Sequence, residues 1–526
     1  MKRVSLVVGA LVGGLTTLAL TALFYLGAQL ARLPFVAFDL FDWLARVLPG
    51  DVVTLGIDTI VNVIIALNLG STSETAKLIE QAMAIVLFVV AGIVAGIVIT
   101  ALVNGSRQPG EWLGAGVGLL TFVALAAVEL SLGVDNPALT LFWIVFLTLA
   151  WGWFTGGTIE RLAREIETDS ERRRALLQMG GSSIAIALAA WGVGRWLSAE
   201  PADTGAGESL AAIAPEADMA ETETPASALE GRIEPAPGTR PEITPEGEFY
   251  RIDINTRPPV IEQAEWQLEV SGLFSNPRNL SLQDLMAFPA VTQTITLSCI
   301  SNRIGGDLIS TARWTGARLR DVLQELGLQP EAQELFIESE DGFYESVAMA
   351  DMLDARTLLV YGMNGETLPT RHGFPLRIYI PNRYGMKQPK WIQRIEAIGM
   401  EGPGYWVERG WSEEARPHII SIIDTVAEET AEDGRVPVGG IAWAGDRGIQ
   451  KVEVQVDDGQ WAEATLRTPP QSTLAWVQWR YGWPAVSGRH TFRVRATDGT
   501  GMLQIEEETG VRPDGATGYH EVMARV

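Results

Sequence analysis

The sequence is poor in the residues that hold most metal centres. Of its 526 residues one is a cysteine, Cys299, and four are histidines, the first of which is His372. A single thiol excludes an intramolecular disulfide, a CxxC zinc site, a CxxCH haem attachment and a four-cysteine iron–sulfur cluster. The apolar N-terminal part has no histidine that could bind a haem there. We therefore expect neither haem nor an iron–sulfur cluster in this chain.

Positive charge is also scarce. The chain carries 40 Lys and Arg against 64 Asp and Glu, a formal net charge of −24 at pH 7. A phosphate backbone needs a basic face, so this composition disfavours nucleic acid as a partner. Because there are no disulfides to interpret, the compartment has to be inferred from topology.

Long apolar runs fill the first 200 residues. Five of them are roughly as long as a helix that crosses a bilayer, the last two being short. These predicted spans are Val4–Leu30, Ala82–Val103, Leu113–Leu132, Leu139–Phe154 and Ser182–Trp196. They lack the series of charges that marks a proton path, which favours an anchor or docking platform over a transporter or sensor.

A sixth apolar run, Val52–Leu69, contains Asp58 and Asn62. We interpret it as an interfacial or re-entrant helix, with a true span as the alternative. By the positive-inside rule, the arginine-rich loop before the last span places everything after Ser198 outside the cytoplasm. The stretch SERRRALLQMGGSSIAIALAA in that region resembles a twin-arginine export signal. Alternatively, Arg172–Arg174 only anchor a helix at the cytoplasmic face.

The single cysteine lies within TLSCISNRIGGDLISTARWTGARL. The β-branched alternation VTQTITLS before it predicts a strand, and Gly305 and Gly306 after it permit a tight turn. A helix is predicted further on, where Leu319 and Val322 recur at helical spacing. A lone cysteine is most often a small buried hydrophobe. A thiol between a strand and a glycine turn is, however, well placed to hold a ligand.

CISNRIGG followed by ISTARWTGARL resembles the sulfite oxidase family of molybdenum enzymes. The resemblance runs from about Tyr250 to Val526 and does not include the apolar part. It implies that Cys299 binds molybdenum, for which a soft thiolate is a suitable ligand, and that the cofactor is molybdenum-molybdopterin. Asn302 and Arg303 match the family pattern and are expected to line the pocket.

A second segment, RHGFPLRIYIPNRYGMKQPKWIQRIEA, also matches the family. The resemblance implies that His372, Arg377, Lys387 and Lys390 contact the pterin and its phosphate, a dianion that favours guanidinium and ammonium groups. Arg377 taken alone could simply lie on the exposed face of a strand. Tyr384 is a weaker candidate for cofactor binding, with a packing role as the alternative.

Two departures from the family pattern concern the substrate. Trp411 stands where animal and plant sulfite oxidases place a tyrosine, and indole cannot supply a phenolic proton. Ile304 follows Arg303 where a second arginine is expected. Arg251 or Arg257 is a candidate to supply the missing positive charge, so the catalytic set is expected to comprise Cys299, Arg303 and these two arginines.

We therefore predict three folded parts: an α-helical transmembrane bundle, an α+β sulfite-oxidase-like molybdopterin domain and an all-β immunoglobulin-like dimerisation sandwich. An acidic Pro/Ala/Glu-rich segment is expected to be a disordered linker. The predicted boundaries are 1–199 for the bundle, 200–247 for the linker, 248–412 for the molybdopterin domain and 413–526 for the sandwich.

The expected protein is a multi-pass enzyme of a bacterial-type membrane, with its catalytic domain on the extracytoplasmic side. It would transfer an oxygen atom to or from a small sulfur substrate as a homodimer in contact with lipid. Electrons would pass to or from a separate carrier, such as a c-type cytochrome or a membrane redox partner. The alternatives are sulfoxide reduction in the same fold and a cofactor-free exported binding module.

Overall fold

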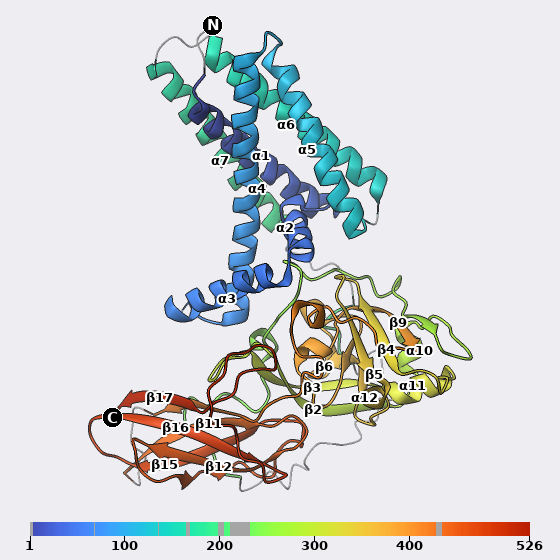
Figure 1. Cartoon of the computed structure of the whole chain (residues 1–526), viewed down its shortest axis with the longest axis vertical. Coiled ribbons are helices and arrows are strands. Elements are labelled where there is room, and N and C mark those ends of the chain that lie inside the picture. Colours follow the sequence, from blue (N-terminus) through green and yellow to red (C-terminus); the bar gives the residue numbers. More distant parts are fainter. Residues whose placement is uncertain are drawn as a thin grey trace. The chain divides into compact units, whose positions relative to one another are not determined.

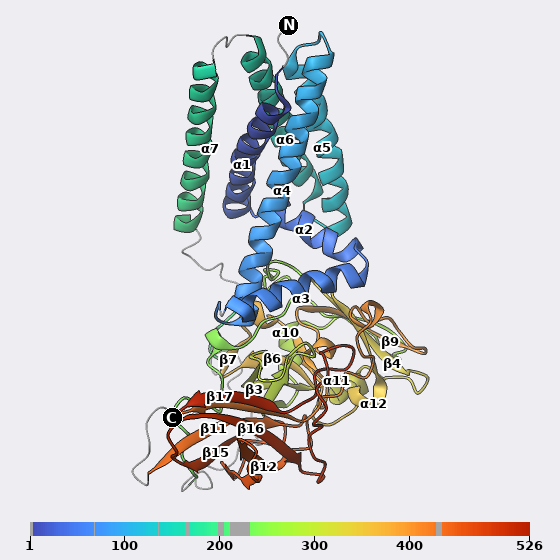
Figure 2. The same ribbon diagram turned by 60° about the vertical axis from the view of Figure 1, so that its left-hand side comes forward.

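The computed structural model describes the residues 4–67, 69–134, 136–164, 169–197, 205–210, 232–427 and 434–526. The chain divides into two compact units. Unit 1 comprises Met1–Asn62, Thr75–Ala202 and Ile254–Thr256, and unit 2 comprises Val63–Glu74, Asp203–Asp253 and Arg257–Val526. Unit 1 is helical, whereas the described strands belong to unit 2 (Figures 1 and 2). This division does not test the predicted domain boundaries, which remain predictions.

Seven long helices are described in the N-terminal part of the chain. They are α1 (Leu6–Ala31), α2 (Val36–Val47), α3 (Gly50–Leu67), α4 (Thr72–Gly105), α5 (Gly110–Leu132), α6 (Pro137–Arg164) and α7 (Asp169–Leu197). Among the described residues, five helices are long and apolar enough to cross a membrane: α1, α3, α4, α5 and the Pro137–Leu162 part of α6.

Four of the five predicted spans therefore fall in helices of sufficient length and hydropathy. The fifth falls in α7, whose apolar part, Leu177–Ala190, is a shorter helix. Helix α3, predicted to be interfacial or re-entrant, is long and apolar enough to be a span. In both views, however, its axis runs across the axis of α4 (Figures 1 and 2). Its placement in the membrane stays a prediction. The side chains of Arg172 and Arg173 in the export-signal-like stretch lie outside the described residues.

Glycines bring neighbouring helices of unit 1 into backbone contact. A Cβ added at Gly13 of α1 would overlap the carbonyl oxygen of Gly92 in α4. The same holds for Gly114 of α5 against Gly152 of α6. Small residues at such crossings let helices pack closely where no hydrophobic driving force separates lipid from protein. This packing was not predicted from the sequence.

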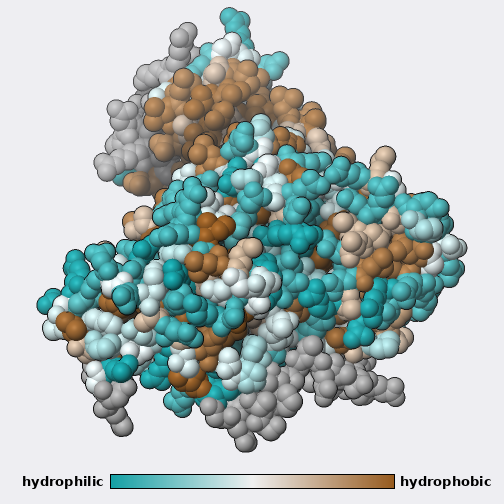
Figure 3. All heavy atoms as spheres, turned by 60° about the horizontal axis from the view of Figure 1, so that its bottom comes forward, coloured by the Kyte–Doolittle hydropathy of each residue, from teal (hydrophilic) through white to brown (hydrophobic). Residues whose placement is uncertain are grey.

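Unit 1 exposes large apolar side chains. Leu120 is 70% exposed, Val7 68% and Phe142 63%. Figure 3 shows hydrophobic atoms gathered over the helices, whereas the visible face of the strand-rich part is mostly hydrophilic. An apolar exterior of this extent is compatible with a membrane anchor.

The first half of unit 2 contains two sheets. One has the strand order β2–β3–β6–β7, with β8 pairing to β6, and the other has the order β1–β9–β4–β5. The bounds of the first sheet are β2 Ala290–Ser298, β3 Ile309–Arg318, β6 Leu358–Met363, β7 Glu366–Thr367 and β8 Arg377–Tyr379. Those of the second are β1 Glu269–Gly272, β9 Ile392–Ile398, β4 Glu334–Ser339 and β5 Tyr344–Ala348. Only β1 and β9 pair in parallel among these described strands.

Short helices close the core of these sheets. They are α10 (Leu282–Met286), α11 (Leu319–Glu325) and α12 (Met349–Met352). One hydrophobic cluster combines Leu335 and Ile395 of one sheet, Ile378 of the other and Val322 of α11, all fully buried. The predicted strand before Cys299 and the predicted helix after it are confirmed as β2 and α11. The apolar side chains of α11 are buried in this cluster, whereas Ile295 and Leu297 of β2 are buried in a second cluster with Trp314.

The C-terminal part of unit 2 is all-β, as predicted. Its two antiparallel sheets have the orders β10–β11–β15–β14 and β13–β12–β16–β17. Their bounds are β10 Ile420–Val426, β11 Arg435–Trp443, β15 Val477–Pro484, β14 Thr465–Leu466, β13 Ala462–Glu463, β12 Ile449–Val456, β16 Arg489–Asp498 and β17 His520–Arg525. Val438, Val454, Phe492 and Val494 form part of the core between them and are at most 1% exposed. Phe492 and Val494 therefore point inward, as expected for alternate residues of a strand with one buried face.

Part of the predicted linker is folded onto unit 2. The Leu210 side chain is 6% exposed and its N–H donates to Gly365 O at 3.1 Å. Arg240 binds Asp424 through Nε at 2.9 Å and Nη2 at 2.7 Å. The prediction of a disordered tether is therefore wrong for 205–210 and 232–247, because specific long-range contacts there are invisible to composition. The remainder of the predicted linker lies outside the described residues.

Candidate active site

Cys299 lies at the end of β2, where the chain turns before entering β3. Its N–H donates to Leu308 O at 2.9 Å, which closes the turn, and its Sγ lies 3.1 Å from Ser301 Oγ. The side chain is 9% exposed. Burial raises the pKa of the thiol, despite hydrogen bonds from Ser301. A positive centre bound at Sγ would offset that cost and hold the sulfur as a thiolate.

Asn302 rigidifies the same turn. Its Oδ1 accepts a hydrogen bond from Leu308 N at 3.0 Å, and its side chain is 6% exposed. A Cβ at Gly306 would overlap this oxygen, so the glycine is needed for the approach. The Asn302 Nδ2 atom is buried and has no hydrogen-bond partner in the described structure. Arg303 is half-buried beside it, with its carbonyl accepting from Gly306 N at 2.9 Å.

Two phenols adjoin the cysteine. The electrostatic effect of Cys299 raises the pKa of both Tyr250 and Tyr384, although burial is the larger cause for each. Burial brings the pKa of Tyr384 to about 12, so its hydroxyl stays protonated at neutral pH. The Tyr384 oxygen accepts a hydrogen bond from His418 N at 3.1 Å. Tyr250 was not predicted as a site residue, although it precedes the predicted Arg251.

The Arg377 guanidinium is buried rather than exposed. It is 5% exposed, on the strand β8, and its flanking residue Ile378 is fully buried. Its Cζ stacks 4.7 Å from the ring centroid of Trp314, and Nη1 donates to His372 O at 3.1 Å. Burial lowers the pKa of Arg377 to about 10, partly offset by Tyr250 and Asp253. The alternative that Arg377 decorates a solvent-facing strand surface is therefore excluded.

His372 adjoins Arg377 and is 1% exposed. Burial, together with Lys390 and Arg377, lowers the pKa of His372 well below its usual range, so the ring is neutral. Its Nε2 is buried and has no hydrogen-bond partner in the described structure. The ring lies edge-on to Phe249, with centroids 5.2 Å apart.

Lys390 completes a cluster of positive charge. Its Nζ contacts Asp253 and lies 4.3 Å from the ring centroid of Trp391. Burial lowers the pKa of Lys390, while Asp253 opposes that shift. Arg251 also pairs with Asp253, with 2.9 Å between Nε and Oδ2. Arg251, predicted to hold substrate, is thus part of the Lys390 network.

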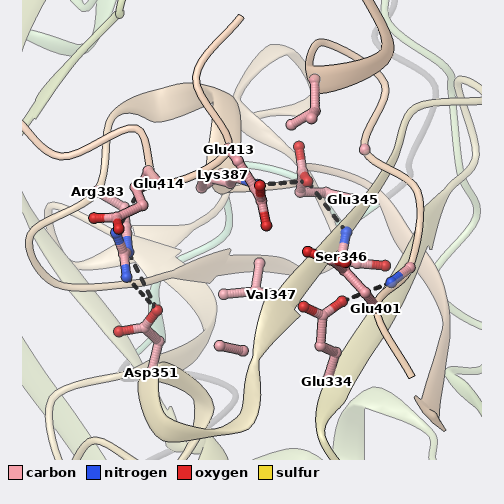
Figure 4. Close-up of a pocket in the computed structure, with 14 residues that line it drawn as sticks. Glu334, Glu345, Ser346, Val347, Asp351, Arg383, Lys387, Glu401, Glu413 and Glu414 are labelled. Carbon is pink, nitrogen blue, oxygen red and sulfur yellow. Dashed lines mark hydrogen bonds and ion pairs between the residues drawn. The ribbon is translucent and has the colours of Figure 1, made fainter. Parts of the chain in front are cut away.

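Lys387 does not join this cluster. Its Nζ donates to Glu345 Oε1 at 2.8 Å, with both side chains buried, on the wall of a separate acidic pocket (Figure 4). Its predicted role in cofactor binding stays a prediction, since the fold pairs it with a carboxylate that the sequence spacing did not reveal. The predicted Arg257 is half-buried.

Trp411 packs in a hydrophobic cluster with Tyr384 and with Ile300, the residue that follows Cys299 in the chain. The Arg512 guanidinium lies over its ring, with Cζ 5.0 Å from the centroid. Two guanidinium nitrogens of Arg512, Nε and Nη2, are buried and have no partner in the described structure. Sequence reasoning missed Arg512, since it lies more than 200 residues from Cys299 with no spacing to connect them.

These observations fit an anionic, hydrogen-bonding cofactor. Asp253 pairs with both Arg251 and Lys390, while Arg377 donates to a backbone carbonyl, so the positive charge gathered here is suited to a phosphate. The orphaned Nε2 of His372 and Nδ2 of Asn302 call for polar partners, since buried polar groups are rarely left unpaired. Tyr250 lies between the two groups, the cysteine turn and the cluster of positive charge: a Cβ at Gly385 would meet both Tyr250 Oη and the carbonyl of Ser298, the residue before Cys299. The Tyr250 ring stacks on Phe249, which contacts His372.

Comparison with known proteins agrees with this chemistry. Residues 255–406 match the family described as "Oxidoreductase molybdopterin binding domain". Sulfite oxidase of Arabidopsis thaliana is 27% identical over 348 residues, covering 54% of this chain and 88% of that protein. Human mitochondrial sulfite oxidase is 32% identical over 300 residues, covering 48% and 55%. The chain thus spans about half the length of the human relative.

Two further comparisons concern bacterial proteins. The uncharacterized oxidoreductase YuiH of Bacillus subtilis is 32% identical over 150 residues, covering 28% of this chain and 74% of that protein. A solved structure of the sulfane dehydrogenase SoxCD from Paracoccus pantotrophus covers 58% of this chain and 86% of its own, with 21% identity and a TM-score of 0.48. That TM-score is too low to carry an argument. On the sequence matches, the chain belongs to the molybdopterin-dependent oxidoreductases of the sulfite oxidase family.

Proposed function

We propose that this oxidoreductase is a multi-pass membrane protein that transfers an oxygen atom to or from a small sulfur compound, on the extracytoplasmic side of a bacterial-type membrane. The observation that carries the proposal is the buried set of Cys299, His372 and Arg377, with the Lys390 side chain, 14% exposed, in the same network of positive charge. A cofactor-free binding module has no need of this set, in which His372 Nε2 is buried without a hydrogen-bond partner in the described structure.

The residues divide into two groups by what they would hold. Cys299 would bind molybdenum, and Arg377 and Lys390 would bind the phosphate of molybdopterin. His372 and Asn302 would orient the pterin through their unpaired nitrogens. Once bound, the cofactor supplies two-electron oxygen-atom transfer chemistry. The protein contributes binding, orientation and exclusion of water.

Positive charge for an anionic substrate has several candidate sources. The sequence has Ile304 where the family pattern has an arginine after Arg303, and Arg251 forms an ion pair with Asp253. We propose that Arg512 substitutes, since its two unpaired buried nitrogens can donate to a sulfur oxyanion. The hydroxyls of Tyr250 and Tyr384 would provide the phenolic donor that Trp411 lacks. Arg303 and Arg257 remain further candidates.

The balance of the reaction fixes what else the enzyme needs. Sulfite and water give sulfate, two protons and two electrons; a sulfoxide, two protons and two electrons give a sulfide and water. With only one cysteine in the chain and no histidine before His372, we propose that electrons pass to or from a separate carrier. A c-type cytochrome or a membrane redox partner would serve. The all-β part would act as an immunoglobulin-like homodimer interface.

Direction and substrate can be tested with the full-length, metal-loaded protein. Sulfite would be assayed with ferricyanide or cytochrome c as acceptor, and dimethyl sulfoxide or methionine sulfoxide with reduced viologen as donor. We expect turnover in one arm, abolished in Cys299→Ala. Turnover of a sulfoxide alone would assign the reductive direction. Absence of turnover and of bound cofactor would overturn the proposal.

A further inference from the structure

A cavity in unit 2, which we call the acidic pocket, is lined in part by Lys387. It has a volume of about 480 Å³ and is bounded by the β5 strand, α12 and the chain from Glu401 to Glu414 (Figure 4). None of Cys299, His372, Arg377 or Lys390 lines it. The acidic pocket is therefore distinct from the proposed molybdopterin site.

The acidic pocket has a large excess of negative charge. Six carboxylates line it: Glu334, Glu345, Asp351, Glu401, Glu413 and Glu414. Two cations line it, and each is already engaged. Lys387 pairs with Glu345 at 2.8 Å, and Arg383 pairs with Asp351 at 2.6 Å.

Two of the remaining carboxylates, Glu401 and Glu413, lie at the exposed edge of the pocket. The nearby Glu401 side chain raises the pKa of Glu413. Glu414 is paired with the exposed Arg416, with 2.9 Å between Oε2 and Nε.

Buried polar atoms on the pocket wall are also left without partners. Glu345 is fully buried; its Oε1 accepts from Lys387 Nζ and, at 3.2 Å, from Ser346 N. Its Oε2 makes no hydrogen bond in the described structure, and neither does Oγ of Ser346, which is 6% exposed. Buried groups of this kind require a partner. Gly402 and Gly404 face these two side chains so closely that a Cβ would overlap them.

The size and geometry of the acidic pocket decide the class of ligand. In the described part of the chain, no group of three or more acidic, His or Cys side chains is placed to hold a metal ion. A cavity of about 480 Å³ is far larger than one ion, and falls in the range of small-molecule sites. We propose that the acidic pocket binds an organic cation through an ammonium or guanidinium group, which would be held by the carboxylates of the pocket, including the unpaired Oε2 of Glu345.

The test is calorimetric titration of the full-length protein in detergent with three probes: spermidine, an oligolysine peptide and calcium chloride. The variant Glu401→Gln/Glu413→Gln removes two exposed charges of the acidic pocket. The matched control, Glu463→Gln/Glu507→Gln, removes two exposed charges elsewhere in unit 2. Circular dichroism and the melting temperature confirm that both variants fold.

We expect spermidine to bind, with affinity reduced about tenfold in the pocket variant and unchanged in the control. Binding of oligolysine with the same loss, but without spermidine binding, would assign the cation to a side chain of a protein partner. If neither spermidine nor oligolysine binds, or if the control variant loses as much affinity as the pocket variant, the proposal is overturned. Calcium binding lost in the pocket variant, with neither amine bound, would overturn it in favour of a metal site.

Discussion

The guanidinium of Arg377 lies over the indole of Trp314, with 4.7 Å between Cζ and the ring centroid, and donates to His372 O. A planar guanidinium can stack on the ring and still present its edge to a phosphate. An ammonium group cannot do both. The stacking thus positions a buried positive charge beside the proposed pterin site.

Arg377→Lys is therefore expected to lower bound molybdopterin about tenfold while the charge is kept. Pterin is assayed in the purified protein after acid oxidation to a fluorescent product. Arg278→Lys, at an exposed ion pair with Glu325, is the matched control and should keep its full content. Equal pterin in the two variants would contradict the assignment of Arg377.

The pair of Asp253 and Lys390 allows a double-mutant test. Asp253→Asn leaves a buried ammonium without its carboxylate, and we expect a loss of about 3 kcal/mol in the stability of cofactor-free protein. Removing both charges in Asp253→Asn/Lys390→Met should restore most of it. Both are measured as free energies of unfolding in denaturant. If the double variant is as unstable as the single one, the pair does not interact as described.

His372 predicts a dependence of stability on pH. Its folded-state pKa lies below the unfolded value of about 6.5, so the unfolded chain takes up the proton first. Stability contributed by the neutral ring is present above that value and is lost as the pH falls below it, by up to about 1.4 kcal/mol per pH unit. His372→Gln should show a shallower loss between about pH 7 and about pH 5 than the parent. Parallel curves would show that His372 does not carry the effect.

The glycine contacts of unit 1 predict a contrast within α5. Gly114→Val should lower stability by about 1–3 kcal/mol, because the new side chain would overlap the backbone of Gly152. Gly116→Val is the control, since nothing lies within 4 Å of a Cβ at that position. Thermal unfolding in detergent reports both. Equal melting temperatures for the two variants would mean that α5 and α6 do not pack through Gly114.

Much of the fold near Cys299 was predictable, since local patterns encode it. The alternation before Cys299 predicted β2, and the spacing of Leu319 and Val322 predicted α11. In α11 the residues at helical spacing are the buried ones, so the period of the sequence records the buried face.

The rest depends on contacts between distant residues. The sequence matched Lys387 to the cofactor by family position, but the salt bridge to Glu345 is set by tertiary packing. Arg512 reaches Trp411 across about a hundred residues, and only the fold brings them together. The folded part of the predicted linker was missed for the same reason, because composition cannot show that Arg240 has a specific partner in Asp424.

The most direct test of the account is the molybdenum and pterin content of the purified full-length protein beside Cys299→Ala, after expression with the cofactor available. We predict near-stoichiometric metal and pterin in the parent. The variant should lose molybdenum and activity while keeping pterin through Arg377, His372 and Lys390. Neither metal nor pterin in the parent, or equal molybdenum in the variant, would contradict the assignment of Cys299 as the metal ligand.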